Sequence, residues 1–160
     1  MAYTGTVPVF AVGTLTSTGV FTDTQTVVVG GKTYTTQTTL TNVDGNVLIG
    51  ASAAATHQNL YDAINLTGTP GTQYAAAMTI NTRVKASAVT ATTTVVKALT
   101  PGEVGNLIAT TETQTNAAWG AATLASGAGN VQDFITSILA LNQINSEVMS
   151  HLKLLTIADD

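Results

Sequence analysis

The sequence predicts an α+β fold, in which a compact antiparallel β-rich module with one packed helix is followed by a C-terminal amphipathic helix. Threonine occurs 32 times in 160 residues, and this β-branched residue suits half-exposed strand positions. Only 9% of the residues are charged, against about 25% in typical soluble domains. Near the C-terminus, apolar residues recur at alternating spacings of three and four, as on one face of a helix. This length is typical of one domain with an appendage.

The first half of the chain begins with a predicted N-terminal arm over residues 1–12. Pro8 disfavours a central strand there. A β-rich module is expected over residues 13–126, and it includes a hairpin with Gly30-Gly31 as its two-residue turn. Asn42–Asn46 predicts a further turn, because Asn, Asp and Gly tolerate positive φ.

One amphipathic helix is predicted inside the module, from Ala53 to Leu66. Ser52 is a candidate N-cap residue, and Gly68–Gly71 ends the helix. Leu60 and Ile64 share one face, so we expect this helix to pack on a sheet.

The rest of the module reads as alternating strand segments followed by a linker. Trp119, the single tryptophan, is expected to anchor the core. Residues 127–130 are predicted to form a short flexible linker. The strand segments that are expected to complete the sheet are residues 84–88, 94–99, 107–113 and 120–125.

A C-terminal oligomerisation helix is predicted over residues 131–158. Seven of the eight residues on its seam are apolar, and each contributes roughly 1.5–3 kcal/mol on burial, so the stripe must be covered. Asn145 is the exception, and a buried amide at an a position fixes register, because a slipped alignment leaves its hydrogen bonds unmade. We predict a homo-oligomer, either a dimer or a trimer, and the alternative is a helix folded back onto its own module. The a and d positions are Val131, Phe134, Ile138, Leu141, Asn145, Val148, Leu152 and Leu155.

Composition excludes several partner classes. The net charge is −4 and the five cationic side chains are scattered, so we expect no nucleic acid partner. No apolar run reaches the about 18 residues of a membrane span, and the N-terminus lacks the features of a signal peptide. We therefore expect no membrane partner and no export. The absence of cysteine excludes disulfides and thiolate metal sites.

Motifs for catalysis or cofactor binding are incomplete. His57 and Asp62 lie roughly 140° apart around the predicted helix, so they do not share a face. Gly31-Lys32-Thr33 ends like a phosphate-binding loop, but that loop needs a glycine where Thr26 stands. The alternation of Asn42, Asp44 and Asn46 lacks the glycine and glutamate of a calcium loop. We predict no catalytic residue, no cofactor and no metal site. Glu147 and His151 read as a solvated helical pair.

Several segments together resemble a module found in virion proteins of tailed bacteriophages. The resemblance covers roughly residues 13–126, and the Gly-x-x-Gly-Asn loop after a helix and strands is also similar to parts of contractile tail sheath subunits. The family has no known catalytic residues, so the resemblance transfers no functional site. The helix after residue 130 is not part of the shared module. The segments that carry the resemblance are Gly30–Tyr34, Asn46–Thr56, Pro101–Asn106, Ile108–Thr113 and Trp119–Leu124.

The resemblance implies a non-enzymatic structural protein, located in the virion and assembled in the host bacterial cytoplasm. The leading hypothesis is a homo-oligomeric capsid decoration (cement) protein on the outside of the head, whose partners are its own copies and the major capsid protein. The alternative is a tail, baseplate or fibre component, including one that contacts the host surface. A third hypothesis, a glycan-cleaving enzyme, needs paired carboxylates, and its candidates Glu103 and Glu112 read more simply as loop and exposed-strand residues.

Overall fold

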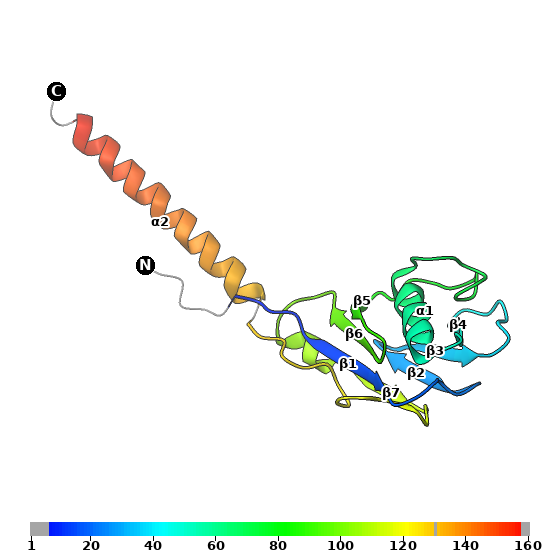
Figure 1. Cartoon of the computed structure of the whole chain (residues 1–160). Helices are drawn as coiled ribbons and strands as arrows, with labels where there is room; N and C mark the ends of the chain where they lie inside the picture. The colour runs from blue at the N-terminus through cyan, green and yellow to red at the C-terminus, as the bar shows by residue number, and fades with distance from the viewer. Residues whose placement is uncertain (1–6, 130, 158–160) are drawn as a thin grey trace.

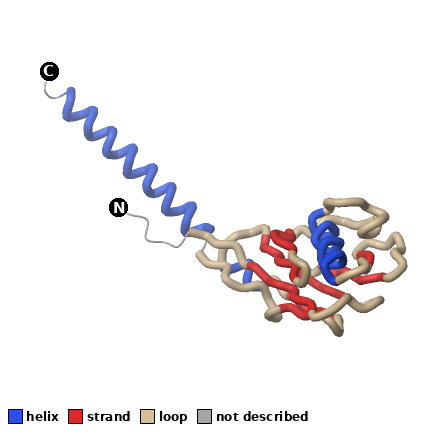
Figure 2. The backbone as a smooth tube through the Cα atoms, in the orientation of Figure 1, coloured by secondary structure: helices blue, strands red, loops and turns tan. Residues whose placement is uncertain are grey.

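The computed structural model describes residues 7–129 and 131–157, and it confirms the predicted α+β class. A β-rich domain with one packed helix, α1, is followed by the long helix α2, which projects away from the domain as a rod (Figure 1). Figure 2, which is coloured by secondary structure, shows that all the strands lie in the domain.

The strands form two four-stranded sheets, whereas the sequence reading expected one. All pairs of the first sheet are antiparallel, and the second contains one parallel pair, β3 with β4. The first sheet has the order β5 (Val84–Val89), β6 (Thr93–Ala98), β1 (Val12–Ser17), β8 (Ala117–Trp119). The second sheet has the order β4 (Asn46–Leu48), β3 (Lys32–Gln37), β2 (Thr26–Val29), β7 (Thr110–Glu112).

The last two predicted strands differ most from the structure. The segment predicted over 107–113 divides into the 3₁₀ helix η1 (Glu103–Leu107) and the short strand β7. The segment predicted over 120–125 makes only isolated bridges, Ala109 with Thr123 and Val12 with Ala125, and the neighbouring strand β8 ends at Trp119. Glycine and alanine are poor strand formers, so residues 120–122 support no continuous ladder.

The predicted hairpin of β2 and β3 is confirmed. Val29 pairs with Lys32, and Gly30 and Gly31 have φ of 62° and 80°. Two consecutive residues with positive φ make the turn that matches the right-handed twist of the strands, which explains the Gly-Gly pair.

Gly45 lies in the second predicted turn, at φ +91°, and a Cβ there would collide with the carbonyl oxygen of Thr33. Gly31 provides a matched control, since its φ is +80° but a Cβ would meet nothing within 4 Å. Gly31→Ala should cost about 1 kcal/mol for the left-handed backbone alone. Gly45→Ala should cost a further 1–3 kcal/mol, on the order of other strained sites. Urea unfolding of both variants tests this, and equal losses would contradict it.

Helix α1 (Ala53–Asn65) begins and ends within one residue of its prediction. The Ser52 side chain accepts a hydrogen bond from the amide of Ala55 at 3.2 Å, and Leu66 ends the helix in the left-handed conformation. Leu60 and Ile64 are buried as expected. α1 packs mainly on β5, β6 and β4, so it contacts strands of both sheets.

Tyrosines occupy the centre of the core, in place of the expected Trp119. Tyr34 and Tyr74 are the largest fully buried side chains, and burial raises the pKa of Tyr34 to about 12. Trp119 is half-buried on the edge strand β8, and its Nε1 donates to the carbonyl oxygen of Thr111 at 3.2 Å. Trp119 thus packs against the core as a partly buried side chain on an edge strand and does not form the centre of the core.

Candidate functional site: helix α2 and the base of the domain

Helix α2 (Val131–Ile157) carries every seam residue that the sequence predicted. The side chains of Ile138, Leu141, Val148 and Leu152 are 44–53% exposed, and Asn145 is exposed as well. The structure thus does not show the alternative in which the helix folds back onto its own module (Figure 1). Three further seam positions lie in the helix, but their side chains are outside the described part: Val131, Phe134 and Leu155.

The apolar face of α2 is broader than the predicted seam. Ile135 and Met149 occupy e positions and Ile144 a g position, next to the a and d residues, and they are 37–59% exposed. The sequence reading missed them because it followed only the a/d repeat, although a wider window at 3.6 residues per turn finds them. We call the following described residues the α2 stripe: Ile135, Ile138, Leu141, Ile144, Asn145, Val148, Met149 and Leu152.

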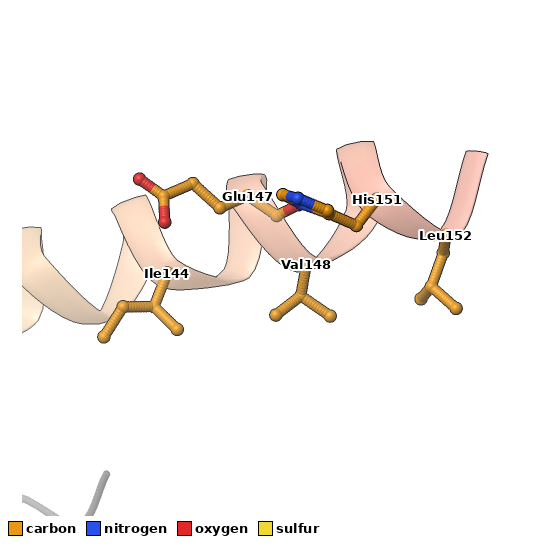
Figure 3. A pocket seen from close by; sticks show the side chains of 5 residues that line it. All are labelled: Ile144, Glu147, Val148, His151 and Leu152. Carbon is orange, nitrogen blue, oxygen red and sulfur yellow. The ribbon is translucent and has the colours of Figure 1, made fainter. Parts of the chain in front are cut away.

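A shallow hollow lies along α2, and Figure 3 shows the side chains that line it. Ile144, Val148 and Leu152 point to one side of the helix, while Glu147 and His151 lie toward the other. His151 Nδ1 lies 2.9 Å from the backbone carbonyl oxygen of Glu147. One helix supplies all five residues and the hollow is open, so this face suits another protein surface better than an enclosed small molecule.

The domain exposes a second apolar surface at the end from which α2 leaves, where Val9, Leu99, Val104 and Leu107 are 45–74% exposed. We call these four residues the base patch. Backbone hydrogen bonds join their segments to one another and to the start of α2. The amide of Gly102 donates to Val9, and that of Glu103 to Gly129. The segments that carry the base patch are thus hydrogen-bonded to one another and to the residues that precede α2.

The segment before α2 is attached to the domain over residues 127–129. Asn106 Nδ2 donates to the carbonyl oxygen of Gly127 at 2.9 Å, and the Gly127 amide donates back to Asn106 Oδ1 at 2.8 Å. Ala128 and Val9 exchange two backbone hydrogen bonds. The flexible linker predicted over 127–130 is thus hydrogen-bonded up to residue 129, and residue 130 lies outside the described residues.

The predicted N-terminal arm is part of the domain from Val9 to Val12. Val9 bridges Ala128, and Ala11 is fully buried. Residues 1–6 lie outside the described part of the chain.

Gly127→Ala is expected to loosen the attachment of α2. A Cβ there would lie 2.5 Å from the carbonyl oxygen of Gly102 and 2.9 Å from Asn106 Oδ1. At Gly120 the nearest atom to a Cβ, the Thr14 carbonyl oxygen, is 3.7 Å away. Gly127→Ala should lower the free energy of unfolding by about 1–3 kcal/mol, as overpacking does, and Gly120→Ala by less than half as much. Chemical unfolding followed by fluorescence checks this, and a stable Gly127→Ala variant would contradict it.

His57 is a core residue in the structure. Its Nδ1 lies 2.8 Å from Thr94 Oγ1 and its Nε2 lies 2.9 Å from Ser17 Oγ, and Phe21 contacts its ring edge to face. The histidine and Thr94 are fully buried. Burial lowers the pKa of His57 to about 4, although a backbone hydrogen bond at Thr92 raises it. Both ring nitrogens are occupied, so the histidine joins α1 to β1 and β6.

The candidate carboxylates lie on separate elements. Glu103 is exposed at the start of η1, and Glu112 is half-buried in β7, where it pairs with Val27 of β2. Neither lines the hollow on α2.

The residues that imitate a calcium loop serve the fold. Asn42 Oδ1 accepts the Ala77 amide, and Asn46 donates to Thr41. Burial opposes ionisation of Asp44, but hydrogen bonds from Lys32 and Thr79 outweigh it and lower the pKa of Asp44 to about 2. In residues 7–129 and 131–157, no group of three or more His, Cys, Asp or Glu side chains gathers as metal ligands would.

Neither described helix combines the length and hydropathy that a membrane crossing needs. Searches against protein-family models, curated proteins and solved structures found no match to this chain.

Proposed function

We propose that this protein is a non-enzymatic structural component of a tailed-bacteriophage virion, a homo-oligomeric decoration protein on the outside of the head. The observation that carries the proposal is the exposed α2 stripe on a helix that projects from the domain. Each large apolar side chain contributes roughly 1.5–3 kcal/mol on burial. A stripe of this size favours association with other copies of the chain.

The chemistry of the domain supports a role in binding. Its charge is low and its surface carries threonines, for example Thr33, Thr38 and Thr39. Among the described residues, every buried side-chain nitrogen and oxygen has a hydrogen-bond partner. The polar groups of the core are therefore used by the fold, and α2 and the base patch carry exposed apolar side chains that are available for binding.

Oligomerisation would strengthen attachment to a particle. Linked copies convert weak single contacts into tight binding through high effective concentration, which suits a repeated shell of capsid subunits. The major capsid protein is the partner that this arrangement implies.

A tail, baseplate or fibre component is the second candidate. The rod shape of α2 favours it, since long helices commonly form stalks (Figure 1).

Copy number on the particle tests the proposal. Particles of the phage that encodes the chain are purified, and quantitative mass spectrometry compares this chain with the major capsid protein. Hundreds of copies, and density on the outer face of the head by electron microscopy, are the expected result. A few dozen copies or fewer at the tail would favour the second candidate, and absence from the particle would overturn both.

A further inference from the structure

We propose that α2 joins three copies of this chain in a parallel, in-register bundle, with all three domains at the same end. This inference rests on the self-association in the proposed function and adds the number and direction of the helices. The occupant of the α2 stripe is therefore two further copies of the same chain.

Asn145 favours the parallel direction. In a parallel bundle, a positions meet a positions, so the amides of Asn145 from neighbouring chains face and hydrogen-bond one another. In an antiparallel pair, a positions meet d positions, which in α2 are apolar, as at Leu141 and Val148. An unpaired buried amide costs about 1–3 kcal/mol. The parallel, in-register alignment avoids that cost.

The flanking positions fit the same alignment. In a parallel bundle a g residue lies beside the e residue five positions later in the neighbouring chain. Ile144 thus meets Met149, an apolar pair, and in the sequence Ser137 meets Asn142, a polar pair. The charged residues of the helix are Asp133, Glu147 and Lys153, which fall at b and c positions. No like charges oppose one another in this alignment.

The width of the α2 stripe favours three helices over two. A two-stranded seam uses mainly a and d positions and has charged residues at e and g. Here Ile135, Ile144 and Met149 are apolar at e and g, and each is at least 37% exposed in the single chain. A third helix covers these flanks.

The residues at the a and d positions do not by themselves decide between a two-helix bundle and a larger one. Ile138 at a with Leu141 at d is typical of two strands, but Leu152 at a with the β-branched Val148 at d reverses that pattern. The apolar flanks therefore decide the number.

The base patch gives an independent reason for the parallel direction. α2 has 27 residues, so it is about 40 Å long at 1.5 Å per residue. An antiparallel arrangement would place the neighbouring domain at the far end and leave the base patch in water. In the parallel arrangement the three base patches surround the start of the bundle and can cover one another.

Two measurements on the full chain test the inference. Light scattering should give three times the chain mass of 16.3 kDa. The chain has no cysteine, so single cysteines report direction without background. Leu152→Cys alone, or Leu141→Cys alone, should form disulfide-linked pairs on mild oxidation, because in a parallel bundle equal a or equal d positions come within the about 7 Å that a disulfide allows. A mixture of the two variants should give no mixed pair.

Each contrary outcome has a distinct meaning. A dimeric or tetrameric mass would overturn the trimer, and mixed Leu141→Cys with Leu152→Cys pairs would overturn the parallel direction, because a d position meets an a position in an antiparallel pair, while self-association would stand. A monomer at high concentration would overturn the inference and the homo-oligomer within the proposed function. The copy number on the particle remains a separate measure of the virion role.

Discussion

The double variant Leu141→Asp/Val148→Asp is expected to be monomeric. Both residues occupy d positions of the α2 stripe, and both are exposed in the single chain. Burying an unpaired carboxylate costs several kcal/mol, so two in every chain outweigh what the remaining apolar contacts provide. Light scattering at high protein concentration should show the mass of one chain in place of several.

The matched control for this experiment is Gln143→Asp/Ser150→Asp. These positions follow Leu141 and Val148 by two residues, lie at f positions on the outside of the bundle, and introduce the same charges at the same spacing. The control should remain oligomeric. An unchanged mass in the first variant would show that the α2 stripe does not join copies, and an equal loss in both would point to destabilisation of the helix itself.

Acidification from pH 7 to pH 4.5 is expected to lower the stability of the domain by up to about 3 kcal/mol, through His57. Burial lowers the pKa of this histidine from 6.5 to about 4. Between these values the unfolded chain binds a proton that the folded chain does not. The stabilisation is therefore complete above pH 6.5 and is lost progressively as the pH falls toward 4.

Urea unfolding of the full chain at fixed concentration measures this dependence. His57→Gln should be less stable at pH 7 and should lose most of the change between pH 7 and pH 4.5. His151→Gln is the control, since His151 lies exposed on α2, and this variant should keep the change. Asp44 does not interfere, because its pKa is about 2 against an ordinary value of 3.8, so its contribution is lost only below this range. A wild-type stability that is flat over this range would contradict the assignment.

The elements whose structure is set by residues close together in the sequence were predicted correctly. The Gly30-Gly31 turn of the β2 and β3 hairpin needs only its own φ angles, and α1 needs its Ser52 cap and its face of apolar residues. The heptads of α2 are local in the same sense, since residues three and four apart share a helix face. The a and d residues of the candidate site could therefore be located from the sequence. The e and g residues that widen the α2 stripe, and the base patch, were found only in the structure.

The sequence by itself determined the hairpin, the two helices and the apolar repeat, because turn chemistry, capping and periodicity act within a few residues. Only the tertiary structure decided the division into two sheets, the edge position of Trp119, the burial of His57 and the attachment of Gly127 to Asn106. Each of these depends on contacts between residues 20 or more positions apart. Such contacts are selected by packing of the whole domain, and no local pattern encodes them.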